Sequence, residues 1–183
     1  VVLDPGHGGM DFGGRSFGLK ESLLTLDIAR RVRRIVGSRR SDVELLMTRE
    51  DDTFVSLTQR TAMANAVGAS AFVSIHLNGY EQEVERGGVT TFVLDTSRDY
   101  QARRLVSDEQ GRRRSEIGGL SMIVARLQRR GQRRASSVLA ESLHRSTIRS
   151  GRRQLPRLYD RGSRSAAFEV LVGARMPAVY LQR

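Results

Sequence analysis

Two histidines follow short apolar stretches of the chain, and their positions suit metal binding. His7 lies in a glycine-rich turn directly after the apolar residues 1–3, and His76 closes the β-branched and aromatic stretch 72–76. Parallel strands of an open α/β sheet bring their carboxyl ends to one crevice. The two imidazoles are therefore expected to approach each other despite their separation in sequence. Imidazole nitrogens are common zinc ligands, which makes both residues candidate ligands.

A carboxylate is needed to complete such a site, because hydrolytic zinc commonly takes three protein ligands from histidine and carboxylate groups and leaves a fourth position open. Glu21 is the best candidate. It lies in the first turn of a helix expected at 20–36, after the loop that carries His7, where a negative charge also complements the helix dipole. Each residue alone has an ordinary reading, as a turn histidine, a helix-start carboxylate or a core histidine. Their combination is more specific and indicates a metal site.

The elements that must position these side chains alternate between β and α patterns. Strands are expected at 1–3, 43–47, 71–75, 89–94, 167–171 and 178–181, and helices at 20–36, 57–67 and 135–149. Ser56 and Gln59 fit a capping box at the start of the second helix, and Gly68 fits its stop. The pattern predicts one α/β domain with a mostly parallel central sheet of about six strands, covered by helices.

Length and composition fit a single domain with a metal site built from nitrogen and oxygen ligands. A chain of 183 residues is sufficient for one core, and it contains no cysteine. The net charge is +11, with one lysine among 31 basic residues. A basic surface can attract nucleic acid, but aromatic residues make up only 5% and no nucleic-acid recognition motif is visible. We assign most arginines to solvated helix faces and expect no nucleic-acid partner.

A series of motifs runs along the chain. They are Leu3-Asp4-Pro5-Gly6-His7-Gly8-Gly9, Lys20-Glu21, Leu46-Met47-Thr48-Arg49-Glu50-Asp51-Asp52, Leu57-Thr58-Gln59-Arg60, Val73-Ser74-Ile75-His76-Leu77-Asn78, Asp160-Arg161-Gly162 and Met176-Pro177-Ala178-Val179. In these residues and in their order, the chain resembles the zinc-dependent N-acetylmuramoyl-L-alanine amidases that cleave peptidoglycan, often found as bacterial cell-division enzymes.

This resemblance implies a hydrolase for the amide between N-acetylmuramic acid and the first alanine of the stem peptide. It implies that His7, Glu21 and His76 hold Zn²⁺, which polarises the scissile carbonyl and lowers the pKa of water toward roughly 7. It also implies export to the periplasm or cell wall, although no signal peptide opens the chain and no segment is apolar enough to span a membrane. We expect a monomeric catalytic domain over 1–183, truncated at both ends, that acts on peptidoglycan, whose stem peptides carry carboxylates.

Gln182 departs from the family pattern. The family places a general-base glutamate after the last core strand, in a Pro-Ala-Val-x-x-Glu context, whereas the chain ends this motif with Gln182. An amide cannot accept a proton as a base, and general acid–base catalysis contributes roughly 10²–10⁴-fold, so an impaired hydrolase is expected. Three explanations stay open: a deliberate substitution, a naturally inactive relative that keeps zinc and binds peptidoglycan, or another carboxylate such as Glu169, which reads as a strand residue.

The segment 80–134 is longer than a minimal amidase needs. It holds one strand and then an arginine-rich, helix-prone region. It resembles the insertion of division amidases in which a regulatory helix covers the active site until an activator, such as a LytM-type protein, binds. Such a helix could place Glu109 or Glu116 on the open zinc position. The alternative is a surface helix that covers the sheet.

Three further polar residues have weaker assignments. Asn78 follows His76 closely and could bind the glycan, although a loop asparagine is more often a turn residue. Asp160 could face the muramyl peptide, or it could be an ordinary loop residue before Arg161 and Gly162. His144 lies within the helix expected at 135–149 and is predicted to be a surface histidine without a role.

Overall fold

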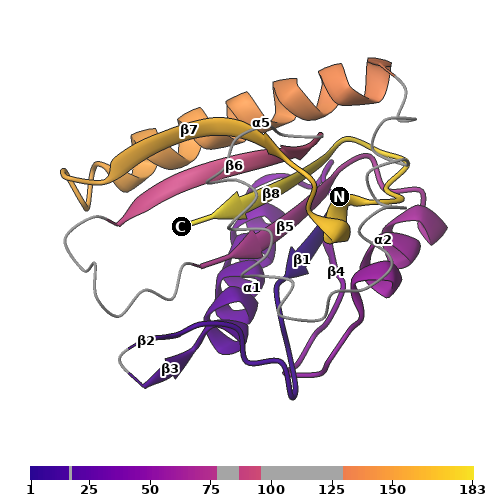
Figure 1. The fold of residues 1–183 in the computed structure, drawn as a ribbon, viewed down its shortest axis with the longest axis horizontal. Helices are drawn as coiled ribbons and strands as arrows, with labels where there is room; N and C mark the ends of the chain where they lie inside the picture. The colour runs from indigo at the N-terminus through magenta and orange to yellow at the C-terminus, as the bar shows by residue number, and fades with distance from the viewer. Residues whose placement is uncertain (17, 78–86, 96–129) are drawn as a thin grey trace.

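A six-stranded sheet forms the centre of the molecule. The computed structural model describes residues 1–16, 18–77, 87–95 and 130–183. Within them the strand order is β4-β1-β5-β8-β6-β7 (Figure 1). The strands are β1 (Val2–Pro5), β4 (Leu46–Met47), β5 (Phe72–His76), β6 (Gly88–Leu94), β7 (Tyr159–Ala166) and β8 (Ala178–Gln182). All neighbours are parallel except β6 and β8, which are antiparallel. The predicted α/β domain with a mostly parallel sheet is confirmed.

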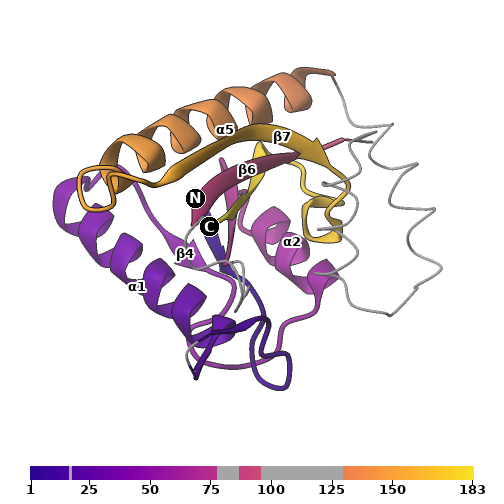
Figure 2. The same ribbon diagram turned by 60° about the vertical axis from the view of Figure 1, so that its left-hand side comes forward.

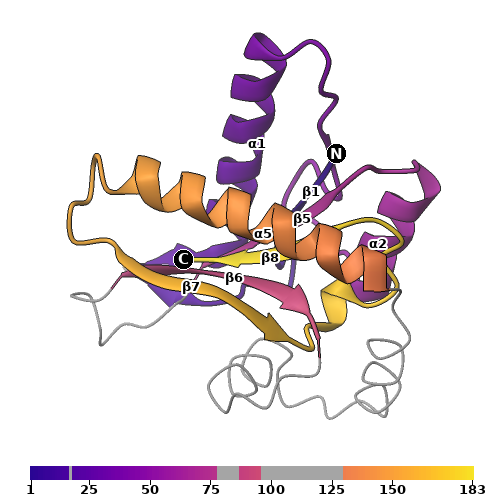
Figure 3. The same cartoon turned by 90° about the horizontal axis from the view of Figure 1, so that it is seen from above.

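Helices cover both faces of this sheet. Figure 2 shows α1 (Glu21–Arg39) and α5 (Arg130–Gly151) on one side and α2 (Leu57–Ala66) on the other. The α1 and α5 side is packed with aliphatic residues such as Leu26, Val73 and Ala140, whereas the α2 side contains the aromatic rings of Phe72 and Tyr180. Figure 3 shows α5 lying along the half of the sheet formed by β8, β6 and β7. None of the helices that the structure describes is long and apolar enough to cross a membrane.

The local signals around α2 are confirmed. The side chain of Ser56 accepts a hydrogen bond from the backbone N–H of Gln59, and the Gln59 side chain accepts one from the backbone N–H of Ser56, which is the predicted capping box. Gly68 follows the helix with a φ of 59°, a left-handed conformation that glycine adopts at little cost. The helix that carries Arg60 is thus specified at both ends by short-range interactions.

One predicted strand is wrong. Residues 169–171 form a short 3-10 helix, η2 (Glu169–Leu171), and the last outer strand is instead β7, which starts at Tyr159. This edge strand is largely exposed and therefore lacks the apolar alternation of a half-buried strand. It also carries an irregularity, because Val89 pairs with Asp160 but Thr91 pairs with Ser163. Gly162, at a φ of 79°, lies in this β-bulge, and its glycine reads as a loop signal in the sequence.

Other boundaries also differ from expectation. The strand expected at 43–47 is reduced to the two residues of β4, and the helix expected at 135–149 extends from Arg130 to Gly151. A small hairpin of β2 (Arg15–Ser16) and β3 (Leu19–Lys20) precedes α1 and was not predicted. It occupies the glycine-rich loop between the first histidine and the first helix, where two-residue strands leave no periodic pattern.

A buried ion pair connects the middle of β1 to α2. Asp4 has no exposed surface, and its carboxylate accepts hydrogen bonds from Thr48, Arg60 and Ser74 at 2.6 to 2.8 Å. The Arg60 side chain is itself only 2% exposed. Removing one partner of a fully buried ion pair leaves a charge without compensation, which is strongly destabilising. The position of β1 within the sheet therefore depends on Arg60.

We predict that Arg60→Gln lowers the free energy of unfolding by about 3–5 kcal/mol, because Asp4 loses its cationic partner in a buried site. Arg34→Gln on the exposed side of α1 is the matched control and is expected to change stability by less than about 0.5 kcal/mol. Chemical denaturation of both variants in the presence of a chelator measures this difference. Equal denaturation midpoints for the two variants would show that the pair contributes little.

Candidate metal centre

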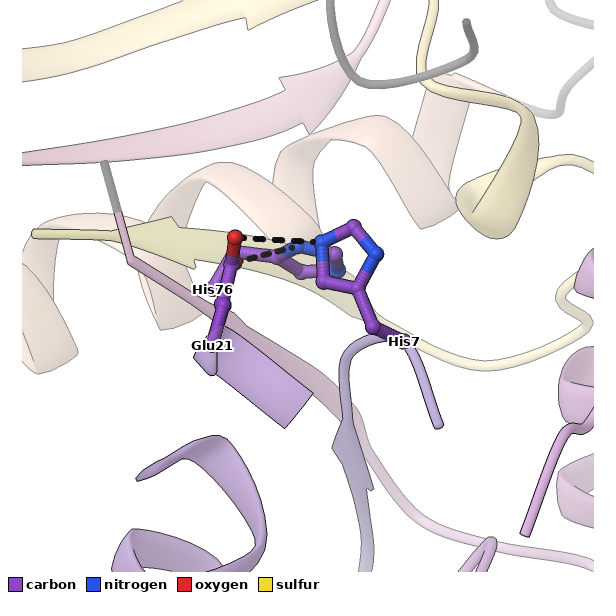
Figure 4. Close-up of side chains that lie close together, drawn as sticks. All are labelled: His7, Glu21 and His76. Atoms are coloured by element: carbon purple, nitrogen blue, oxygen red, sulfur yellow. Dashed lines mark ion pairs between the residues drawn. The ribbon is translucent and has the colours of Figure 1, made fainter. Parts of the chain in front are cut away.

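Three side chains from different segments converge at one edge of the sheet. His7 follows β1, Glu21 begins α1, and His76 ends β5 (Figure 4). One ligand atom from each lies within 4.8 Å of the others, and all three residues are buried. The two imidazole rings approach edge to face with their centroids 4.8 Å apart. The carboxyl ends of the parallel strands therefore bring the three candidate ligands together.

Glu21 lies between the two histidines. Its Oε2 is 3.3 Å from Nε2 of His7, and its Oε1 is 3.2 Å from Nδ1 of His76. The backbone N–H groups of Gly14 and Leu77 each donate a hydrogen bond of 2.8 Å to one of its oxygens. Both carboxylate oxygens are thus fixed from the backbone side, and they face the imidazoles on the other side.

The backbone of His7 adopts an unusual conformation that buried arginines maintain. His7 has a φ of 60°, and it is the only non-glycine residue with a positive φ among those that the structure describes. Arg60 donates hydrogen bonds to the carbonyls of His7 and Pro5, and Arg49 donates to those of Pro5 and Gly6. Because these carbonyls are buried, both guanidinium groups satisfy polar groups and fix the turn that presents the imidazole.

Asp11 orients the His7 ring. Its Oδ1 is 3.0 Å from Nδ1 of His7, and the hydrogen bond with His7, opposed by partial burial, holds the pKa of Asp11 below its usual range. An ionised carboxylate can only accept, so it favours a proton on Nδ1 and leaves the Nε2 lone pair directed at Glu21. This carboxylate–histidine arrangement is typical of metal ligands in proteins.

Two glycines allow the ligands to pack closely. A Cβ atom at Gly6 would lie 2.4 Å from Nε2 of His76, and one at Gly13 would lie 2.5 Å from Cδ2 of His7 and 2.7 Å from Oε2 of Glu21. Gly13 also has a φ of 65°. Any larger residue at these two positions would displace the candidate ligands themselves.

The electrostatics of the cluster fit a cation. Burial by itself raises the pKa of Glu21, but the neighbouring His7 and His76 rings outweigh burial and hold that pKa well below its usual range. Glu21 is therefore a carboxylate at neutral pH. An ionised carboxylate and two neutral imidazoles are all electron-pair donors, and their convergence in a buried site favours a positive ion between them. Two nitrogens and one oxygen form a ligand set that zinc accepts.

Gln182 lies beside this cluster. It pairs with His76 in the register between β8 and β5, and the residue is 1% exposed. Tyr180, two residues earlier on the same face of β8, stacks on the His76 ring at a centroid distance of 4.4 Å. Glu169 follows the carboxyl end of β7, at the opposite edge of the sheet, since Leu94 and Ala166 pair there while Gln182 pairs with Thr90. Glu169 therefore lies at the opposite end of the sheet from the three candidate ligands.

Several predicted site residues lie elsewhere. Asn78, Glu109 and Glu116 fall outside the described residues. Asp160 lies on β7 opposite Val89, which packs against α5, so it is on the face of the sheet opposite the cluster. The prediction for His144 is wrong, because it is buried and lies between Thr91 at 3.1 Å and Asp160 at 2.7 Å.

The ends of segment 96–129 are attached far from the candidate ligands. The chain enters it after β6 at Asp95 and leaves it at the start of α5. Gln132 and Ser136 in that part of α5 bond to the backbone of Ala174, Met176 and Ala178, which lead into the amino end of β8. Both attachment points are therefore at the edge of the sheet opposite Gln182 and His76. The predicted regulatory role of this segment is not tested by the described residues.

Comparisons with known proteins agree on one family. The sequence profile described as N-acetylmuramoyl-L-alanine amidase matches residues 1–182. The chain is 32% identical over its whole length to the amidase AmiA of Escherichia coli, of which it spans 64%, and 42% identical over 92 residues to the amidase CwlM of Bacillus licheniformis, of which the match spans 36%. The chain thus covers about one to two thirds of these relatives. The crystal structure of an N-acetylmuramoyl-L-alanine amidase from Clostridium difficile 630 aligns with 98% of this chain and 76% of its own, at a TM-score of 0.66 and 29% identity.

We predict that Gly13→Ala weakens Zn²⁺ binding at least about tenfold, because outer groups that orient ligands typically contribute 10–100-fold to metal affinity and the new methyl group would displace His7 and Glu21 directly. Gly18→Ala is the control, since Gly18 has a similar φ of 76° but no atom of the described residues outside its chain neighbours lies within 4 Å of an added Cβ. Competition with a fluorescent chelator measures both affinities. Equal losses of affinity in the two variants would mean that the backbone conformation alone, and not contact with the ligands, explains the effect.

Proposed function

The chain belongs to the N-acetylmuramoyl-L-alanine amidase family, and from this premise we propose that it hydrolyses the amide between N-acetylmuramic acid and L-alanine in peptidoglycan with the help of zinc. The proposal is supported above all by the convergence of His7, Glu21 and His76 at one edge of the sheet. These residues would hold the ion. Since peptidoglycan is the substrate, the protein would act at the cell wall.

The residues around the ion would orient its ligands and fix the turn that carries His7. Zinc, when bound, supplies Lewis-acid polarisation of the scissile carbonyl and lowers the pKa of water. Asp11 and the backbone donors to Glu21 keep the ligand atoms aimed at one point. Arg49 and Arg60 fix the turn that carries His7. The protein thus presents a rigid, largely water-excluded ligand set, and only the proton-transfer group remains to be assigned.

Gln182 occupies the position from which a carboxylate would move that proton. It is buried beside His76, and its amide keeps the length and hydrogen-bonding reach of glutamate without its basicity. This observation favours a second candidate function, in which the protein retains zinc and binds peptidoglycan without appreciable turnover. The two candidates share the metal site and differ only in the rate of the chemical step.

A protein partner is a further proposal. A solved relative is described as the CwlD amidase from Clostridioides difficile in complex with the GerS lipoprotein, at 21% identity to this chain and a TM-score of 0.59. At that identity the likeness concerns the fold alone. An activator of the LytM type stays a prediction for this chain.

We predict that Gln182→Glu raises the rate of peptide release from purified sacculi by roughly 10²–10⁴-fold while zinc content stays the same, because the change restores a general base and leaves the ligands in place. Release of stem peptides is measured by chromatography, and zinc by elemental analysis. A faster rate with unchanged zinc supports the impaired amidase.

A double variant provides the control. Glu21→Gln combined with Gln182→Glu is expected to lose both zinc and activity, since the carboxylate between the histidines is then absent. Equal, negligible rates for the parent and Gln182→Glu, with full zinc occupancy in both, would favour the binding protein over the enzyme. Failure of the parent protein to retain zinc at all would overturn both candidates.

A further inference from the structure

A groove of about 590 Å³ lies between the second half of α5 and the start of β7. Arg145, Arg149 and Arg152 line it at a spacing of four and three residues, so they form one row along the last turns of α5 and the residue directly after it. All three are exposed. Neither Arg145 nor Arg149 has an ion pair with any residue in the described ranges. Arg152 donates a long bond of 3.3 Å to the carbonyl of Leu158, and its charge also acts on the Asp160 carboxylate. The groove thus presents three guanidinium groups to solvent.

Buried, hydrogen-bonded residues form the base of the groove. His144 belongs to the buried stripe of α5 and is held between Thr91 on β6 and Asp160 on β7. Asp160 also accepts a hydrogen bond from the backbone N–H of Gly162 in the β-bulge. These contacts fix the position of α5 against β6 and β7, and thereby the position of the helix that carries Arg145 and Arg149.

The histidine network is not a second hydrolytic centre. Thr91 has no exposed surface, because it lies beneath α5, and a nucleophile there could not reach a substrate. Its hydroxyl bonds to Nδ1 of His144, while the carboxylate of Asp160 bonds to Nε2. The network of Thr91, His144 and Asp160 therefore has a structural role. The exposed arginines are the residues of the groove that can bind a ligand.

The groove opens at the same end of the sheet as the metal centre. Asp160 pairs with Val89, and the next β6 residue, Thr90, pairs with Gln182, which in turn lies beside His76. Asp160 faces α5, whereas His76 and Gln182 are on the opposite face with Tyr180. The two sites thus lie at the same end of the sheet but on its opposite faces. A long polymer that passes around this end could contact both.

We propose that this groove is a second binding site for peptidoglycan, in which Arg145, Arg149 and Arg152 bind carboxylates of stem peptides next to the one being cleaved. The inference rests on the proposed function. Guanidinium groups bind carboxylates through paired hydrogen bonds, and stem peptides carry several carboxylates along each glycan strand. Glu141 and Asp160 also line the groove and repel a dense polyanion, which favours a peptide over a phosphodiester polymer.

The test measures how the parent protein, with Gln182 unchanged, binds to sacculi stripped of phosphodiester polymers. Binding is measured by co-sedimentation, and the parent protein is expected to leave the sacculi intact. A triple variant, Arg145→Gln, Arg149→Gln and Arg152→Gln, is expected to bind about tenfold more weakly, the sum of three exposed ion pairs. The control changes three exposed arginines outside the groove, Arg34→Gln, Arg39→Gln and Arg157→Gln. It loses the same net charge and is expected to change binding less than about twofold.

Two further arms identify the ligand. On sacculi whose carboxylates have been amidated, the triple variant and the parent are expected to bind equally. Soluble poly(glycerol phosphate) is expected to compete poorly. Equal losses in the groove and control variants, a loss that persists on amidated sacculi, or strong competition by the phosphate polymer would each overturn the proposal. Peptide release from a small soluble muramyl peptide by Gln182→Glu reports on the proposed function alone, so failure of one is distinguishable from failure of the other.

Discussion

The site depends on a single constrained turn. His7 can present its imidazole at the sheet edge only because its backbone adopts a left-handed conformation, which costs a non-glycine residue of order 1 kcal/mol or more. Arg49 and Arg60 offset that cost by donating hydrogen bonds to the three successive backbone carbonyls of residues 5–7. Arg60 lies on α2, and Arg49 lies two residues after β4. The first ligand is therefore positioned by the scaffold and not by its own loop.

The second constraint is the carboxylate between the two imidazoles. Backbone N–H groups from two loops hold Glu21, and glycine at positions 6 and 13 lets the rings approach it. These contacts hold the carboxylate and both rings in place, which limits the reorganisation needed on binding. Gln182 extends the same packed layer through Tyr180 and His76. The candidate ligands and Gln182 are thus neighbouring but separate side chains, so that a change at one need not alter the other.

The sequence was informative wherever the signal was local. Apolar runs ending in histidine, a helix with an acidic first turn and a capping box are short-range patterns, and they located β1, β5, α1 and α2. Strand β7 was missed because an exposed edge strand with a bulge at Gly162 has no alternation to detect. His144 was misjudged because its partners come from strands on either side of α5 in the sequence. The role of Arg60 was equally hidden, since a hydrogen bond to a distant carbonyl leaves no periodicity.

The charge within β1 also has a consequence for the order in which the chain folds. The donors to Asp4 lie 44, 56 and 70 residues away along the chain. Burying the strand before they arrive would desolvate an unpaired carboxylate, at a cost of several kcal/mol. An early intermediate built from the first helix and strand alone is therefore disfavoured. The first strand is expected to enter the sheet in the same cooperative, late step that docks α2 and adds β5, and the geometry of the histidine turn forms only then.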